Sequence, residues 1–385
     1  MTIKERLDEY KIAFWYYKNR FHPINQHKAV FCNYNGKGFG CNPKYIALEM
    51  LKRNPGWDIV WVVKEDKYKF PKGIRTVKWD SKEAIYELAT AVVWVDNQRK
   101  LWYHRKRKKQ FFIETWHGGA ETLKKIGADN PANFDNKPYE HTSHHMNRIV
   151  NIMVSNGKLC NEIYKSAFLY NGKILECGSP RNDILVNCPK NFEAKVKNFF
   201  NIPHNAHIVI YAPTYRNGRK TDKMQLDGHK MLDALSGKFG GDWYMLKRLH
   251  PTMAQSASGL DYGGNIINAS EYDDMQELLA ASDVLVSDYS SVIGEFSIMK
   301  KPVFLYAEDI SDYSRERDFY VDYFGLPYLI AEDEDKLVEN ILLFNQEIYE
   351  RKVRDYHKKI GSVEKGTASE SVVDAIYKHI EEEFS

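Results

Sequence analysis

The stretch 282–299 places a strand, a tight turn and a helix in immediate succession. Residues 284–286 are apolar β-formers, residues 287–291 are mostly small or polar, and the following residues are compatible with a helix. Such a turn presents hydroxyl and backbone N–H groups at a helix N-terminus, where the partial positive charge favours a phosphate group. The stretch therefore predicts a phosphate-binding turn in an α/β domain, which restricts the folds open to the rest of the chain.

Short apolar strands alternate with helices along most of the chain, which predicts parallel sheets in an α/β fold. Because 385 residues exceed what a single hydrophobic core usually organises, we expect two domains. A change in composition near residues 188–203 favours a boundary there. We therefore predict one Rossmann-like domain over residues 1–195 and a second, with C-terminal helices, over residues 196–385.

Polar and cationic side chains follow three successive strands of the second predicted domain. The carboxyl ends of parallel strands lie along one edge of a sheet, so these side chains are expected to converge. Cations and hydroxyl groups that converge in this way favour a multiply charged phosphate ligand. The residues are Arg216 after the first strand, Lys247, Arg248 and His250 after the second, and Asp288, Ser290 and Ser291 after the third.

His117 lies at the carboxyl end of the strand predicted over residues 111–115 and is followed by Gly118 and Gly119. Active sites of parallel sheets lie at this edge. The two glycines allow a substrate or another backbone segment to approach the imidazole ring. A functional role for His117 is therefore favoured over a purely structural one.

Two further features of the first domain have alternative explanations. Gly38 belongs to the glycine-rich loop 35–40, which either approaches an anionic substrate or is simply a tight turn. The loop lacks the last glycine of the dinucleotide fingerprint, so no nicotinamide cofactor is expected. Arg181 follows a stiff turn, where it either clamps a phosphate group or forms a capping ion pair with Asp183. Gly38 and Arg181 are candidate acceptor-side residues.

Residues 99–109 contain seven Lys or Arg residues interleaved with Trp and Tyr. A surface for anionic lipid head groups or a polyanionic acceptor is favoured over a merely solvated loop. Nucleic acid is not expected, because the formal net charge is only +3 and no companion motif is present. The aromatic-rich helix predicted over residues 4–21 either lies on a membrane interface or packs on its own domain.

The cellular compartment is indicated by weaker signals. No apolar run approaches the length of a membrane-spanning helix, and the N-terminus lacks the apolar core of a signal peptide. The five cysteines form no CxxC pair, which fits a reducing compartment. We therefore expect a cytoplasmic protein that is soluble or attached to a membrane surface.

Several short motifs follow one another between about residues 110 and 325. They are Thr115-Trp116-His117-Gly118, residues 123–129, residues 178–183, residues 211–216, Leu249-His250-Pro251, residues 287–291 and Lys301-Pro302. As a set, they resemble the CDP-glycerol glycerophosphotransferase family, which includes the wall-teichoic-acid primases and polymerases and related capsule enzymes. One departure is residues 119–122, which replace the family's usual Thr-Pro and leave the acceptor unidentified.

The resemblance implies a GT-B fold, in which two Rossmann-like domains flank an interdomain cleft. The N-terminal domain would bind the acceptor, a polyprenyl-linked saccharide or a growing polymer, and the C-terminal domain a CDP-alditol donor. The resemblance also implies peripheral attachment to the inner, cytoplasmic face of the plasma membrane. No cofactor is expected, because the CDP-linked donor is a substrate, and no metal ion is expected, because no metal site is evident in the sequence.

The same resemblance implies roles for individual residues. His117 would be the catalytic base or would orient the acceptor, and His250 would contact the donor diphosphate. Glu295, one helical turn beyond the phosphate-binding turn, would accept hydrogen bonds from ribose hydroxyl groups. The donor-binding residues would be Arg216, Lys247, Arg248, Asp288, Ser290, Ser291 and Glu295.

The implied reaction transfers glycerol phosphate, or a related alditol phosphate, in teichoic-acid or capsule synthesis. An acceptor hydroxyl group attacks the β-phosphorus of the donor, and CMP leaves. Two alternatives stay open: a GT-B glycosyltransferase or epimerase that uses a nucleotide sugar, and a non-enzymatic protein that binds polyanions or membranes.

Overall fold

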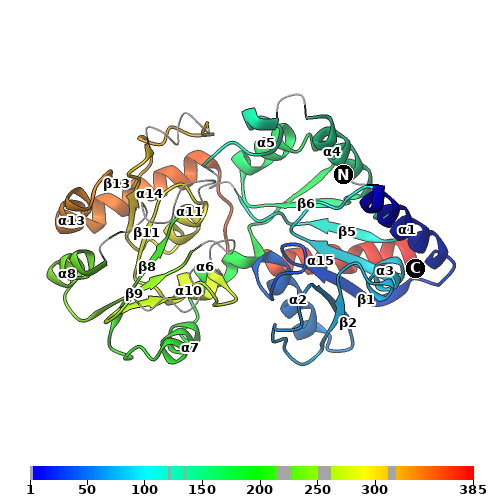
Figure 1. Ribbon diagram of the computed structural model, residues 1–385, viewed down its shortest axis with the longest axis horizontal. Coiled ribbons are helices and arrows are strands. Elements are labelled where there is room, and N and C mark those ends of the chain that lie inside the picture. The colour runs from blue at the N-terminus through cyan, green and yellow to red at the C-terminus, as the bar shows by residue number, and fades with distance from the viewer. Residues whose placement is uncertain are drawn as a thin grey trace. The chain divides into compact units, whose positions relative to one another are not determined.

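A computed structural model of the chain contains two compact units, each an α/β fold with its own parallel sheet (Figure 1). The first unit comprises residues 1–120, 126–183 and 363–385, and the second comprises residues 121–125 and 184–362. The structure describes residues 3–119, 123–133, 136–214, 226, 228–249, 262–310 and 318–385. The two parallel sheets confirm the predicted α/β class.

The first unit is organised around a seven-stranded parallel sheet with the strand order β3-β2-β1-β4-β5-β6-β7. The strands are β1 (Asn25–Cys32), β2 (Asp58–Val63), β3 (Ile74–Lys78), β4 (Ala91–Asp96), β5 (Phe111–Glu114), β6 (Ile152–Ser155) and β7 (Lys173–Glu176). The helices are α1 (Ile3–Asn19), α2 (Cys41–Arg53), α3 (Lys82–Thr90), α4 (Lys137–Ile149), α5 (Lys158–Ala167) and α15 (Ala368–Phe384), with 3₁₀ turns η1 (Gly127–Asp129), η2 (Pro131–Asn133) and η3 (Pro180–Asn182). The order reverses between β1 and β4, where doubly wound sheets bind their ligands.

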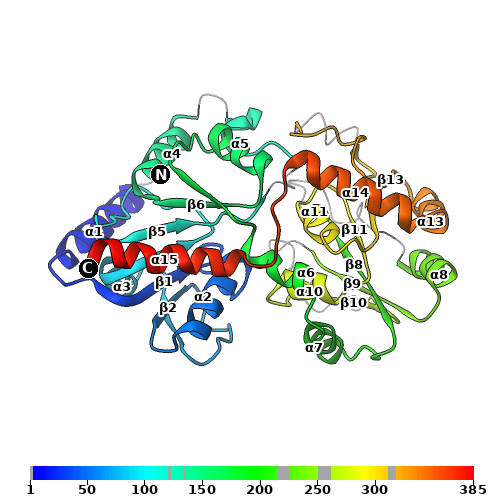
Figure 2. The same ribbon diagram turned by 180° about the vertical axis from the view of Figure 1, so that it is seen from behind.

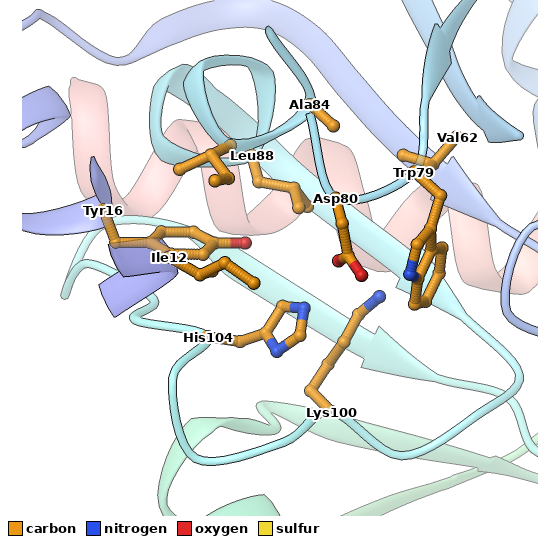
Figure 3. Close-up of a pocket in the computed structure, with 10 residues that line it drawn as sticks. Ile12, Tyr16, Val62, Trp79, Asp80, Ala84, Leu88, Lys100 and His104 are labelled. Carbon is orange, nitrogen blue, oxygen red and sulfur yellow. The ribbon is translucent and has the colours of Figure 1, made fainter. Parts of the chain in front are cut away.

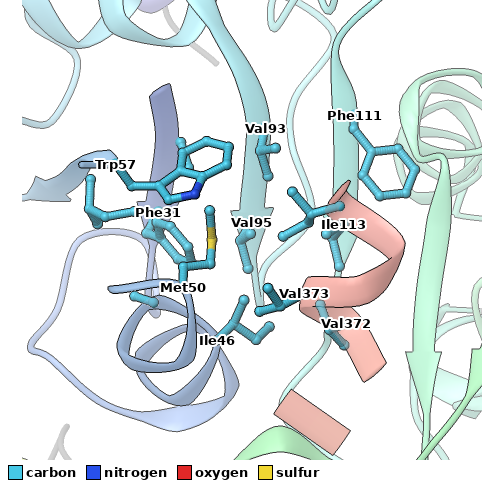
Figure 4. Packing of buried hydrophobic residues seen from close by; sticks show 14 of the residues in the cluster. Phe31, Ile46, Met50, Trp57, Val93, Val95, Phe111, Ile113, Val372 and Val373 are labelled. Carbon is cyan, nitrogen blue, oxygen red and sulfur yellow. The ribbon is translucent and has the colours of Figure 1, made fainter. Parts of the chain in front are cut away.

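Local sequence explains these elements. Every residue of β4 is buried, as expected for a parallel strand that is covered on both faces. Ser81 caps α3, because its Oγ accepts the N–H of Ala84 over 3.0 Å. Strands β1, β4 and β5 pack their apolar side chains against α2 and α15 in one core cluster (Figure 4). This core holds the three parallel strands side by side, so the loops that follow β1, β4 and β5 lie at the same edge of the sheet.

The last helix of the chain belongs to the first unit (Figure 2). Its residues Val372, Val373 and Ile376 have no exposed surface and lie in the core cluster. The carboxylate of Asp183 accepts the first N–H groups of α15, from Ala368 (2.9 Å) and Ser369 (2.8 Å). A carboxylate at a helix N-terminus satisfies N–H groups that have no intrahelical partner.

This position of α15 differs from the predicted division, which assigned all of residues 196–385 to the second domain. The compact units instead separate at residue 183, and residues 363–385 return to the first unit. The physical reason is the core: the apolar face of α15 is buried against the first sheet.

The second unit is organised around a six-stranded parallel sheet with the order β10-β9-β8-β11-β12-β13, which reverses between β8 and β11. The strands are β8 (His207–Ala212), β9 (Trp243–Lys247), β10 (Ile266–Asn268), β11 (Val284–Ser287), β12 (Val303–Tyr306) and β13 (Leu329–Ala331). The helices are α7 (Asn191–Phe200), α8 (Gly228–Phe239), α10 (Met275–Ala281), α11 (Val292–Ser297), α13 (Glu334–Leu342) and α14 (Gln346–Ile360), while α6 (Asp183–Asn187) begins at the boundary between the units. The predicted strand, turn and helix of residues 282–299 are confirmed as β11, its turn and α11.

A short segment that follows the His117 loop belongs to the second unit. Lys124 and Phe319 form an antiparallel bridge, and the N–H of Lys125 donates to the carbonyl oxygen of Asp318 over 2.8 Å. The chain therefore crosses into the second unit at residues 121–125 and then returns to the first.

Candidate active site

His117 lies at the C-terminal edge of the first sheet, just beyond β5. Its ring is half-buried, and its Nδ1 lies 2.9 Å from the carbonyl oxygen of Asn97 in the loop after β4. The side-chain amide nitrogen of Gln98 lies farther from Nδ1, at 3.4 Å. Because a carbonyl oxygen only accepts hydrogen bonds, the shorter contact to Asn97 assigns the proton to Nδ1, which donates it. In the neutral ring, Nε2 is then the nitrogen that accepts a proton, as a general base requires.

The loops after β1 and β4 form the surroundings of His117. The side-chain amide of Asn97 donates to Asn33 Oδ1 (2.7 Å), and the N–H of Tyr34 donates to Asn97 Oδ1 (2.8 Å). The Tyr34 ring meets the imidazole edge-on, with centroids 5.2 Å apart. The sequence predicted this edge for His117 but missed the two asparagines, whose available signal was their place directly after apolar strands.

A buried row of ionisable side chains ends three neighbouring strands of the first sheet. Cys32, Asp96 and Glu114 are paired in register across β1, β4 and β5, and Lys100 forms a buried ion pair with Asp96. Burial, and next the charge of Asp96, raise the pKa of Glu114 well above its ordinary value, which favours the uncharged form of its carboxyl group. Sequence reasoning missed this row, because its members are far apart along the chain.

In the second unit, Asp288 lies directly after β11, at the switch point of the sheet. Its carboxylate accepts the N–H of Thr214 (2.9 and 3.0 Å), the hydroxyl group of Thr214 (2.6 Å) and the N–H of Tyr289 (2.6 Å). Only 2% of Asp288 is exposed. Asp288 thus ties the loop after β8 to the loop after β11, which supports a positioning role at the predicted donor site.

Ser290 and Ser291 lie half-buried in the turn before α11. The hydroxyl group of Ser291 donates to Glu295 Oε1 over 3.3 Å, and the amide of Gln276 in α10 donates to Glu295 Oε2 over 2.7 Å. Glu295 is only 3% exposed. The structure therefore brings these predicted residues together, and it adds Gln276, which sequence reasoning missed because α10 precedes β11 without a recognisable motif.

Lys247 is the last residue of β9 and is largely buried. Its Nζ lies 5.9 Å from the centroid of the Tyr211 ring and 4.6 Å from that of Tyr262, and burial lowers its pKa. Arg248 instead donates from Nη1 to the carbonyl oxygens of Ala269 (2.7 Å) and Ser270 (2.6 Å). This geometry makes Arg248 a clamp on the loop after β10.

The other predicted donor-side residues, Arg216 and His250, lie outside the described residues.

The acceptor-side candidates lie around the start of α2. Gly38 has φ +71, a conformation that favours glycine, so the turn itself explains this residue. The backbone N–H of Arg181 donates to Asn42 Oδ1 (3.1 Å), and its Nη1 lies 3.2 Å from Cys41 Sγ. Arg181 is therefore in contact with the start of α2, while Asp183 accepts from the start of α15.

Several side chains of the basic cluster 99–109 contact other parts of the first unit. Lys100 and His104 point into a cavity of about 20 Å³ that is also lined by Tyr16 of α1 and Asp80 (Figure 3). Arg107 donates to the carbonyl oxygen of His22, and Lys109 to that of Glu383. Arg105, Lys108 and Lys109 keep exposed side chains. Within the described residues, no helix has the length and apolar character that crossing a bilayer requires.

Comparison with known proteins extends over nearly the whole chain. A teichoic acid poly(glycerol phosphate) polymerase of Staphylococcus epidermidis is 32% identical over 373 residues, which cover 92% of this chain and 51% of that protein. This chain therefore spans about half the length of that relative. A teichoic acid glycerol-phosphate transferase of Staphylococcus aureus is 28% identical over 376 residues, which cover 92% of this chain and 94% of that protein.

Solved structures agree with these relatives. A variant of the wall teichoic acid polymerase TagF, soaked with CDPG, aligns with a TM-score of 0.86 and 29% identity over 100% of this chain and 96% of that chain. This likeness confirms the predicted GT-B-like fold with two Rossmann-like domains. The family model described as CDP-Glycerol:Poly(glycerophosphate) glycerophosphotransferase matches residues 14–378. The chain therefore belongs to the CDP-glycerol:poly(glycerophosphate) glycerophosphotransferase family, as its motifs predicted.

Proposed function

We propose that this protein transfers glycerol phosphate, or a related alditol phosphate, from a CDP-linked donor to a hydroxyl group of a lipid-linked saccharide or polymer. CMP is the leaving group, and the product belongs to teichoic-acid or capsule synthesis. The family match over residues 14–378 is the observation that carries this reaction class. The soak of a related polymerase with CDPG supports the CDP-linked donor.

The donor belongs to the second unit in this proposal. Its diphosphate binds at the turn that carries Ser290 and Ser291, with Lys247 supplying positive charge from the end of β9. Hydroxyl groups, N–H groups and cations stabilise the charge that develops on the transferred phosphoryl group and on CMP. Arg216 and His250 add cationic groups to the same site, as the family motifs imply.

The proton acceptor belongs to the first unit. The acceptor hydroxyl group attacks the β-phosphorus, and His117 takes its proton at Nε2, while the bond from the β-phosphorus to the bridging oxygen of CMP breaks. The hydrogen bond from Nδ1 to Asn97 supports this role, because it fixes the tautomer in which Nε2 is basic. A positioned general base contributes roughly 10²–10⁴-fold in rate.

The test measures CMP release from CDP-glycerol in the presence of a lipid-linked acceptor. His117→Ala is expected to lower kcat by roughly 10²–10⁴-fold. His141→Ala is the matched control, because His141 is an exposed histidine on α4 of the same unit. Equal kcat values for the two variants would contradict the role of His117. Replacing CDP-glycerol by CDP-ribitol identifies the alditol.

We also propose that the protein attaches to the inner face of the plasma membrane through α1. Large apolar side chains recur at spacings of three and four residues along α1 and just beyond it, and each is more than half exposed. They are Leu7, Tyr10, Phe14, Tyr17 and Phe21. The opposite face of the helix is anchored by the buried Tyr16. A helix with this exposed stripe is suited to lie in a lipid interface.

The positive charge beside α1 supports the same attachment to an anionic membrane surface. Trp102 of the basic cluster donates to Glu9 of α1 over 2.9 Å, so the exposed Arg105 and Lys108 belong to a loop that packs on this helix. Cations beside an apolar stripe favour anionic lipids, and the attraction weakens with salt.

Sedimentation with vesicles of three parts phosphatidylcholine and one part phosphatidylglycerol tests this attachment. The double variant Phe14→Glu and Tyr17→Glu is expected to lose at least about tenfold in vesicle affinity, because each change puts a charge into the apolar stripe. Leu343→Glu is the control, since Leu343 is also more than half exposed but lies in the second unit. Equal binding of all proteins would exclude α1 as the attachment site.

A further inference from the structure

We propose that Glu114 and Asn42 are positioning residues of the transfer reaction, because together they hold the backbone of Trp116 in the conformation that aims His117. The inference rests on the proposed role of His117 as the general base. Neither residue needs to touch a substrate, since both act through the loop that follows β5.

Trp116 has an unusual backbone conformation. Its φ is +51, in the left-handed region that an aromatic residue adopts only at an energetic cost. Residues held in this region cluster at functional sites, where the surrounding structure compensates for the strain. The loop before His117 therefore needs contacts that keep Trp116 in place.

Two side chains supply these contacts from opposite ends of the residue. The N–H of Trp116 donates to Glu114 Oε1 over 2.9 Å, and the carbonyl oxygen of Trp116 accepts from Asn42 Nδ2 over 3.0 Å. Glu114 ends β5 and Asn42 lies in the first turn of α2. Each is only 1% exposed, so water does not replace either hydrogen bond.

The conformation of Trp116 determines where His117 points. The two rings lie against one another, with centroids 4.0 Å apart and an interplanar angle of 33°. From this position the Nδ1 of His117 reaches the carbonyl oxygen of Asn97 over 2.9 Å. A rotation of the Trp116 peptide would move the imidazole away from Asn97 and remove the bond that fixes its tautomer.

Asn42 also connects this clamp to a second family motif. Its Oδ1 accepts the N–H of Arg181 over 3.1 Å, in the turn that follows β7. The amide orientation of Asn42 is thereby fixed, because the same side chain must donate to Trp116 and accept from Arg181. Both ends of the amide are used, as expected of a residue that orients a loop.

The surroundings of the Glu114 carboxyl group indicate which substitutions test its positioning role. Among the residues that the structure describes, none hydrogen-bonds to Glu114 Oε2, which is buried. Burial and the neighbouring Asp96 raise the pKa of Glu114, which favours the uncharged form of this side chain. Glutamine reproduces the neutral shape and keeps an acceptor oxygen, whereas methionine keeps the approximate size and removes the acceptor.

The experiment compares Glu114→Met, Glu114→Gln and Asn42→Leu in the CMP-release assay with a lipid-linked acceptor. We expect Glu114→Met and Asn42→Leu to lower kcat by roughly 10–10²-fold, the loss associated with a displaced catalytic group. The KM for CDP-glycerol is expected to stay within about twofold, because the donor belongs to the second unit. Glutamine is expected to rescue most of the kcat that methionine loses.

Nitrogen NMR of the histidine rings supplies a readout that does not depend on turnover. The His117 signals, identified by their loss in His117→Ala, are expected to show a protonated Nδ1 in the parent protein. In Glu114→Met they are expected to show a mixture of tautomers, while circular dichroism and the melting temperature report whether the protein remains folded.

The outcomes separate this inference from the proposed function. His117→Ala could be inactive while folded Glu114→Met keeps the kcat and the His117 tautomer of the parent protein. In that case the positioning role of Glu114 is wrong, and the role of His117 as general base stands. If Glu114→Gln loses as much kcat as Glu114→Met, the acceptor oxygen is not what matters, and the inference is also overturned. Full activity of His117→Ala would instead contradict the proposed function.

Discussion

Replacing Thr214 by valine tests whether Asp288 holds together the two loops of the second switch point. The change removes the hydroxyl group that donates to Asp288 Oδ1 over 2.6 Å and keeps a side chain of similar size. The backbone N–H of Thr214 still donates to the carboxylate. One of the hydrogen bonds that join the loops after β8 and β11 is therefore lost, and the others remain.

The magnitude follows from the charge and the exposure of this contact. A hydrogen bond to a charged group contributes roughly 1.5–3 kcal/mol. Thr214 is only partly buried, so water replaces part of the contact, and we expect the free energy of unfolding of the second unit to fall by about 1.5 kcal/mol. If the same loop lines the donor site, the KM for CDP-glycerol should rise by up to about tenfold.

Fluorine NMR of protein labelled with 5-fluorotryptophan during a urea titration measures this effect. Trp243 is the one of the eight tryptophans that belongs to the second unit, so its resonance reports on that unit. Thr214→Ser is the matched control, because serine keeps the hydroxyl group. Identical urea midpoints for the valine and serine variants would show that the hydroxyl group of Thr214 does not stabilise the contact with Asp288.

Three further predictions concern stability. Lys100→Met should lower the free energy of unfolding by about 3–5 kcal/mol, because it leaves Asp96 buried without its cation, and Asp96→Asn should restore most of the loss in a urea titration. Burial lowers the pKa of His357 to about 4 from an ordinary 6.5. The unfolded chain therefore binds a proton at His357 at a higher pH than the folded protein does, and the free energy of unfolding should fall as the pH drops from 6.5 towards 4. His357→Gln should make this pH dependence weaker, and an unchanged pH dependence would contradict the role of His357. Gly178→Ala should cost roughly 1–3 kcal/mol by thermal unfolding, since its φ is +99 and a new Cβ would lie 2.8 Å from Glu364 Oε2; an unchanged melting temperature would contradict this expectation.

The sequence predicted features that depend on neighbouring residues. The apolar run of β11 and the polar turn after it are contiguous, so the strand, turn and helix were recognisable. The place of His117 was also predictable, because a strand end in a parallel sheet fixes which edge the next residues occupy. The order of the motifs predicted the family, since several weak signals in one sequence are specific together.

The sequence did not predict features that depend on long-range packing. The buried pair of Asp96 and Glu114 exists only because β4 and β5 are neighbours in this register. The number of basic residues in the cluster 99–109 did not indicate that Lys100 faces inward, because its buried partner Asp96 becomes a neighbour only in the folded protein. C-terminal helices were predicted, but the sequence alone does not say which sheet covers α15.

The proposed reaction moves the β-phosphorus of a CDP-alditol to the acceptor. Its most direct test uses CDP-glycerol labelled at the β-phosphorus, together with a lipid-linked acceptor, and identifies both products by mass spectrometry. The proposed transfer predicts that CMP is released and that the label appears in a phosphodiester on the acceptor. Release of CDP, or a label that stays with the nucleotide, would contradict it.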